Sequence, residues 1–214
     1  MLNAAKIQFS KEELLLLQNA QIILTKNDIM QKVVAMFSDL ALDMQQQVKS
    51  WQPHLPEVLV ASEPRISRGE QYRRLPWVML DYPRIFGKTD ICAFRCFFWW
   101  GNDISITLHL RGIFAETWMA PLENAIAENR LTGFALSISD DEWLHHEEAG
   151  THLALPLLAG DDRENHLRGR SFIKLRKGFP VHQLQQSPEL LLEAFRSLLQ
   201  VFLSVSYPGD ERVP

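Results

Sequence analysis

An acidic, histidine-containing segment over residues 140–152 carries residue types that bind metal ions. If it is helical, Glu142 lies three residues before His145 and four before His146, so a carboxylate and an imidazole share one face. His152 follows as a fourth candidate ligand. One Glu-x-x-His unit is weak evidence for a metal, because the di-metal bundles that use it present two such units and further glutamates. We therefore favour a solvated acidic segment, with a metal site as the alternative.

A second candidate site lies on a β-hairpin predicted over residues 91–111. Side chains alternate between the two faces of a strand, so the length of the turn decides which residues share a face. A two-residue turn, Gly101-Asn102, would place Phe94 beside His109, whereas a three-residue turn ending at Asp103 gathers the apolar residues of both strands on one face. We favour the three-residue turn.

The opposite face then mixes aromatic, cationic and polar side chains, and we call it the mixed face. Its members are Arg95, Phe97, Trp99, Ser105, Thr107, His109 and Arg111. One interpretation places Phe97 and Trp99 under a helix and the polar residues in solvent, which is the commoner arrangement. The other is a platform for a ligand or partner. His109 could serve as a base there, although an isolated strand histidine is more often structural.

Known catalytic and cofactor motifs are absent. The sequence contains no G-x-S-x-G, no G-x-G-x-x-G and no phosphate-binding loop, so we expect no bound cofactor. Cys92 and Cys96 lie four apart in one predicted strand, which places their Cα atoms ~13 Å apart, too far for a disulfide. We expect both to be small buried hydrophobes.

The composition is that of an ordinary globular protein. The 214 residues are 46% hydrophobic and 22% charged, and a formal net charge of -4 argues against a protein that mainly binds nucleic acid. No apolar run approaches ~18 residues, so we expect no membrane span. The N-terminal residues lack the pattern of a signal peptide, and we expect a soluble, cytoplasmic protein of bacterial type.

An α-hairpin is predicted over residues 1–50. Ser10 and Glu13 form a capping box, which begins a helix that should reach about Leu24. Asn27 or Asp28 should cap a second helix that ends before Pro53. Leu14, Leu17, Ile22 and Leu24 give the first helix a broad apolar stripe that we expect to be buried. The apolar stripe of the hairpin could serve an oligomer interface, but packing on a sheet is the more frequent outcome.

The remaining elements form the sheet and its helices. We predict strands near 58–60 (or a turn there), 65–67, 75–82, 133–139 and 172–175, and a helix over 113–130 that is kinked or restarted by Pro121. Ser187, Pro188 and Glu189 should begin an amphipathic helix over 187–206, capped by the Ser187 hydroxyl. The acidic stretch 140–165 precedes the basic stretch 168–177, so we favour pairing between them over binding of a nucleic-acid strand.

Together these patterns predict one α+β domain: an antiparallel sheet over 58–180 around the central hairpin, with an N-terminal α-hairpin and a C-terminal helix packed on it. The favoured function is a binding or protein-interaction module that uses the mixed face to bind an unknown protein or small molecule, with self-association left open. The alternative is a small metal-dependent hydrolase, or another enzyme, that uses Glu142, His145 and His146.

Overall fold

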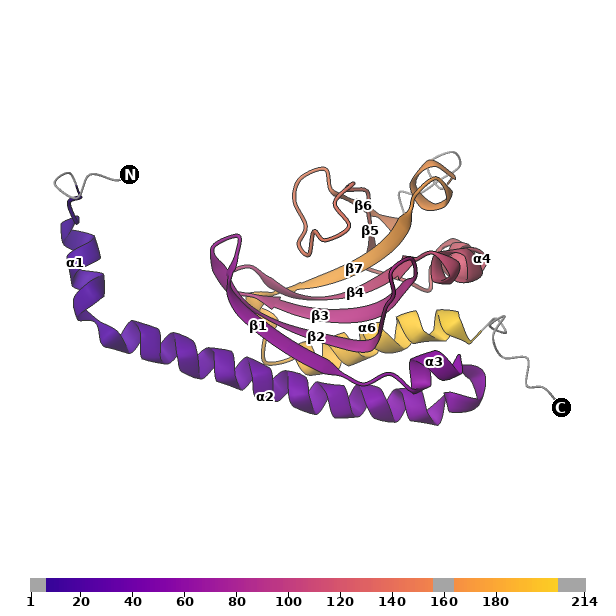
Figure 1. The fold of residues 1–214 in the computed structure, drawn as a ribbon, viewed down its shortest axis with the longest axis horizontal. Helices are drawn as coiled ribbons and strands as arrows, with labels where there is room; N and C mark the ends of the chain where they lie inside the picture. Colours follow the sequence, from indigo (N-terminus) through magenta and orange to yellow (C-terminus); the bar gives the residue numbers. More distant parts are fainter. Residues whose placement is uncertain (1–6, 156–163, 204–214) are drawn as a thin grey trace.

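The computed structural model describes residues 7–155 and 164–203. Within these ranges seven strands form one antiparallel sheet in the order β1-β2-β3-β4-β7-β5-β6 (Figure 1). The strands are β1 Arg65–Tyr72, β2 Leu75–Phe86, β3 Ile91–Trp99, β4 Asp103–Arg111, β5 Ala135–Ser137, β6 His152–Ala154 and β7 Phe172–Pro180. The main helices are α1 Lys11–Gln18, α2 Ala20–Ser50, α3 Glu57–Val60, α4 Ile113–Ala127 and α6 Ser187–Phe202. The predicted α+β class and antiparallel sheet are confirmed.

The central hairpin has the predicted faces, but its turn lies one residue earlier than expected. Phe98 pairs with Ile104, so the three turn residues are Trp100, Gly101 and Asn102. Gly101 adopts a φ of 73°, and the Asn102 side chain donates to the carbonyl of Trp100. The register therefore differs by two residues from the predicted one, and an even shift leaves every side chain on its expected face.

The apolar face of the sheet is covered by helices α2, α4 and α6 (Figure 1). Phe94 of β3 packs against Phe195 and Phe202 of α6, with ring centroids 5.1 and 5.4 Å apart. The C-terminal helix is thus confirmed as a core helix. Its predicted cap is wrong, because Ser187 is buried inside the first turn and its hydroxyl donates to the carbonyl of Leu184.

The predicted N-terminal α-hairpin is wrong. The capping box at Ser10 is present, but the chain leaves helical geometry at Asn19 and not between residues 24 and 28. Helix α2 then runs without interruption to Ser50 and packs on the sheet from Met30 onward. Helix α1 has no buried residue and projects away from the sheet (Figure 1).

Several smaller predictions have mixed outcomes. Residues 57–60 form helix α3 and not a strand, whereas the strand predicted at 65–67 is confirmed as the start of a longer β1. Pro121 lies inside the single helix α4. Cys92 and Cys96 are free and buried. In the described ranges we find no helix with the length and hydropathy needed to cross a bilayer.

Candidate functional site

The mixed face is covered by the irregular segment 138–151 between β5 and β6, which we call the cover loop. This differs from the helix that sequence patterns suggested. The covered face includes polar residues as well as Phe97, since Ser105, Thr107, His109, Lys174 and Arg176 are all buried. Buried polar side chains need partners, and the cover loop supplies most of those described below.

Glu142 joins the cover loop to strand β4. One carboxylate oxygen accepts a hydrogen bond from His109 Nε2 at 2.9 Å, and Arg111 Nη1 lies 2.8 and 3.0 Å from the two oxygens. Burial, together with the charges of Lys174, Arg95 and Arg111, lowers the pKa of His109 to about 3. His109 is therefore neutral near pH 7 and donates its Nε2 proton to Glu142.

Lys174 fixes the backbone of the same loop. Its ammonium donates to the carbonyl oxygens of Glu142 and Leu144 at 2.9 and 2.5 Å. Burial, followed by the nearby charge of Arg95, lowers the pKa of Lys174 to about 8. Carbonyl dipoles thus solvate a cation that burial has removed from water.

Tyr72 and His146 form a third attachment. The backbone N–H of His145 donates to the Tyr72 hydroxyl at 2.9 Å, and that hydroxyl lies 2.6 Å from His146 Nδ1. The opposite ring nitrogen of His146 lies 2.5 Å from a carboxylate oxygen of Glu148. The ring of Trp99 lies 4.7 Å from that of His146, measured between centroids, with the planes tilted by 58°. Its indole N–H donates to the carbonyl of Tyr72. Trp99 is therefore part of the attachment.

Arg95 lies at the edge of the covered region. It binds Asp81 through two nitrogens at 2.6 and 3.1 Å, and its Nη1 lies 3.4 Å from Nδ1 of His145. Because a guanidinium can only donate, Nδ1 of His145 is the acceptor and the ring proton lies on Nε2. Burial and the charge of Arg95 lower the pKa of His145 to about 2, so the ring is neutral.

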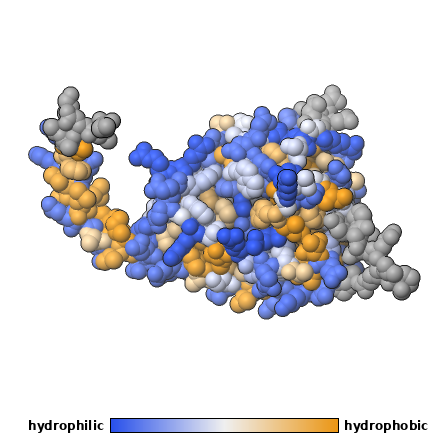
Figure 2. Space-filling view, in the orientation of Figure 1, coloured by the Kyte–Doolittle hydropathy of each residue, from blue (hydrophilic) through white to orange (hydrophobic). Residues whose placement is uncertain are grey.

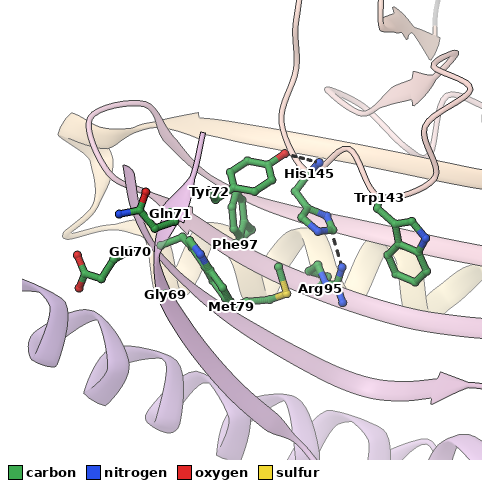
Figure 3. Close-up of a pocket in the computed structure, with 10 residues that line it drawn as sticks. Gly69, Glu70, Gln71, Tyr72, Met79, Arg95, Phe97, Trp143 and His145 are labelled. Atoms are coloured by element: carbon green, nitrogen blue, oxygen red, sulfur yellow. Dashed lines mark hydrogen bonds between the residues drawn. The ribbon is translucent and has the colours of Figure 1, made fainter. Parts of the chain in front are cut away.

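An open pocket of about 540 Å³ lies between the cover loop and strands β1 to β3 (Figure 3). Its walls come from Gly69, Glu70, Gln71, Tyr72, Trp77, Met79, Arg95, Phe97, Trp143 and His145. Most of these side chains are aromatic or apolar, and Arg95 with His145 forms a polar end. The volume is within the range of small-molecule sites, ~300–1,000 Å³.

Gly69 shapes one wall of this pocket. A Cβ atom at this position would lie 2.6 Å from the indole nitrogen of Trp77, its cross-strand partner. The absence of a side chain therefore lets the indole lie flat over the β1 backbone. Any larger residue at 69 would displace Trp77 and change the pocket.

The predicted mixed-face residues lie in different environments in the structure. Arg95 and Phe97 line the pocket, whereas Thr107 and His109 are buried beneath the loop and Arg111 binds Glu142. The ligand role of the whole face stays a prediction.

The four predicted metal ligands also have separate environments. Glu142 binds Arg111, His145 faces Arg95, and His146 binds Tyr72 and Glu148. His152 Nδ1 lies 2.9 Å from the Thr151 hydroxyl. Across residues 7–155 and 164–203, no three His, Cys, Asp or Glu residues are grouped in a way that could hold a metal.

The predicted pairing of acidic and basic stretches is found in part. Arg176 binds Asp103 and lies 3.5 Å from Glu147, and Arg170 contacts Asp140 together with the carbonyl of Ile138. Asp161 and Asp162 of the acidic stretch lie outside the described residues.

Sequence reasoning missed several residues of the site. Asp81 and Lys174 lie on the mixed face because side chains alternate along their strands. The same alternation in the sequence could have identified both residues. Tyr72 and Trp143 reach the pocket from a strand end and an irregular loop, where no periodic pattern exists.

Comparisons with protein-family models, curated protein sequences and solved structures returned no match for this chain. The site must therefore be interpreted from its own geometry.

Proposed function

We propose that this chain is a binding protein whose pocket holds a flat, largely apolar group that carries a hydrogen-bond acceptor. The observation that carries the proposal is the pocket itself, which lies where the mixed face meets the cover loop. Arg95 and Phe97 belong to the mixed face, and Trp143 and His145 belong to the cover loop. The two candidate regions of the sequence thus contribute to a single cavity.

Aromatic walls support the apolar part of the proposed ligand. Phe97 lies 5.3 Å from the Tyr72 ring and 6.3 Å from the Trp77 ring, measured between centroids. Trp143 is about half exposed, at 49%, on the cover-loop side of the cavity. A bound ring would bury the exposed part of this indole, a contact that stabilises by about 0.5–1.5 kcal/mol beyond its buried area.

The free N–H donors of Arg95 support the second part of the proposal, a hydrogen-bond acceptor on the ligand. Its contacts with Asp81 and His145 use three of the five N–H donors of a guanidinium, so two can serve a ligand. Asp81 balances the charge of Arg95, and the neighbouring imidazole of His145 is neutral. The polar end therefore favours a carbonyl or carboxylate oxygen without requiring a multiply charged anion.

The same chemistry could come from a free small molecule or from an aromatic side chain of a partner protein. We place this function in the bacterial-type cytoplasm, and the two free, buried thiols are compatible with a reducing compartment.

The test is titration of ¹⁵N-labelled protein while the tryptophan indole N–H signals are observed by NMR. Indole-3-acetate represents a free ligand, N-acetyl-tryptophanamide a partner's side chain, and indole a ring without an acceptor oxygen. We expect shifts of the Trp77 and Trp143 signals, at least tenfold weaker binding in Trp143→Ala, and unchanged binding in Leu42→Ala, whose side chain is exposed elsewhere. The proposal fails if none of the probes moves these signals, or if Trp143→Ala binds as the parent does.

A further inference from the structure

The N-terminal end of the molecule is an exposed apolar arm, which we define as residues 7–24. Figure 2 shows it as a largely hydrophobic projection at the left of the molecule. It contains nine of the fourteen large hydrophobic residues that are exposed within the described ranges: Ile7, Phe9, Leu14, Leu15, Leu16, Leu17, Ile22, Ile23 and Leu24. Such a concentration of exposed apolar residues marks an interaction surface.

The second half of α1 carries leucines on every side, whereas its first turn carries Lys11, Glu12 and Glu13. Four consecutive leucines, residues 14–17, project around nearly the whole circumference of α1, because an α-helix has 3.6 residues per turn. A helical segment with leucines on all sides is normally enclosed by other elements. Packing one face of α1 on a flat surface would leave the other leucines in water.

Helix α1 also has little to stabilise it among the residues that the structure describes. It has eight residues and buries none of them, whereas isolated helices shorter than ~12–15 residues are marginal in water. Its capping box supplies two hydrogen bonds at one end. The rest of its stability must come from packing against something else.

The arm cannot obtain that packing by folding back on its own sheet. Helix α2 continues unbroken from Ala20 to Ser50, and from Met30 onward it is held in the core. Lys26 still holds α2 to the sheet, with its ammonium 2.9 Å from the Glu70 carboxylate of β1. The residues before it, 20–25, extend ~9 Å further at 1.5 Å per residue. Among residues 7–155 and 164–203, no element encloses the arm, and a second molecule could do so.

The exposed apolar area matches what a stable dimer needs. The exposed fractions of the nine residues together equal about five fully exposed large side chains, which is roughly 800–1,000 Å². A standard protein interface buries about 800 Å² on each partner. A self-complementary contact between two arms would therefore have the area of a stable interface.

The bend between α1 and α2 offers a receptor for such a contact. A groove of about 430 Å³ lies there, and its apolar walls are Phe9, Leu16, Leu17, Ala20 and Ile23. Leu14 and Leu15 are exposed but are not part of these walls. Two copies related by a two-fold axis could each place such residues into the groove of the other.

The charges of the arm favour a protein partner of this kind. Lys11 is opposed by Glu12 and Glu13, so the arm is slightly acidic, as is the whole chain with its net charge of -4. Helices that lie on membranes are rich in lysine and arginine and bind anionic lipids. With a single net negative charge over residues 7–24, this arm has no electrostatic attraction to an anionic membrane and little repulsion from a second copy.

We propose that the arm is a dimerisation element, in which α1 and the first turns of α2 pack against the same segment of a second copy of this chain. The cavity proposed to bind ligand is not part of this contact, and the two proposals stand independently.

Sedimentation of the full chain over roughly 1–100 μM tests the proposal. Leu16→Glu changes an arm residue that is 61% exposed, and Leu42→Glu makes the same change at a position that is 60% exposed on α2 outside the arm. We expect the parent and Leu42→Glu to have twice the monomer mass, and Leu16→Glu to have the monomer mass. Circular dichroism should show both variants folded, because neither side chain is buried in the monomer.

Two results would overturn the proposal. A dimer that survives Leu16→Glu makes its contact elsewhere. A parent chain that stays monomeric throughout has no arm-to-arm dimer. Flotation of that monomer with phosphatidylcholine vesicles would then show that a lipid surface binds the arm instead.

Discussion

Replacing Glu142 with glutamine tests whether charge holds the cover loop on the mixed face. The substitution preserves the size of the side chain but removes its negative charge. It also places an amide N–H₂ group among donors, since His109 Nε2 and Arg111 Nη1 both donate to the carboxylate. One amide oxygen remains as an acceptor, so at least one of these contacts loses its partner.

The expected loss follows from these contacts. Hydrogen bonds to a charged group contribute about 1.5–3 kcal/mol, compared with about 0.5–1.5 kcal/mol between neutral groups. The Glu142 side chain is 16% exposed and that of Arg111 24% exposed, so water screens a part of the charge. We therefore expect Glu142→Gln to lower the free energy of unfolding by about 2 kcal/mol.

Urea unfolding at pH 7.5 measures this loss, and hydrogen exchange locates it. The amide of His145, which donates to the Tyr72 hydroxyl, should exchange faster in Glu142→Gln as the loop opens more often. Glu147→Gln is the matched control, because Glu147 is 55% exposed and lies 3.5 Å from Arg176. We expect it to change the free energy of unfolding by less than about 0.5 kcal/mol.

The reasoning is refuted if the two variants have the same free energy of unfolding. It is also refuted if Glu142→Gln is less stable but the His145 amide exchanges as slowly as in the parent. That result would mean that the carboxylate stabilises the sheet without holding the loop.

Three further predictions follow from the buried groups. Because burial lowers the pKa of His109 from 6.5 to about 3, the unfolded chain binds a proton that the folded chain does not. Stability should fall from pH 7.5 to pH 5 by about 2 kcal/mol for this residue, and urea titrations of His109→Gln should show a shallower fall. Protein purified without a histidine tag should contain substoichiometric metal by mass spectrometry, since His145 and His146 have separate partners; stoichiometric zinc, iron or manganese that is lost on replacing both would contradict this. Burial raises the pKa of the Cys92 and Cys96 thiols, so iodoacetamide should label them only in denaturant, and rapid labelling of the folded protein would show that β3 opens.

Local patterns determined much of the sheet. Alternation along residues 91–111 placed Arg95 and His109 on the correct face even though the turn was displaced, because a shift of two residues preserves every face. The capping box at Ser10 was correct for a similar reason, since its two hydrogen bonds join residues three apart. Interactions of this range depend on neighbouring residues and can be derived from them.

Only the tertiary structure decided what those residues do. Glu142 and His146 suit a metal ion or ion pairs equally well, and the choice depends on partners such as Arg111 and Tyr72, which are 31 and 74 residues away. The sequence likewise showed an apolar stripe along residues 14–24, but the prediction that it is buried is wrong, because these residues are exposed. Burial depends on where α2 lies relative to the sheet. Side-chain periodicity specifies a face, whereas the groups that meet that face are specified by packing over the whole chain.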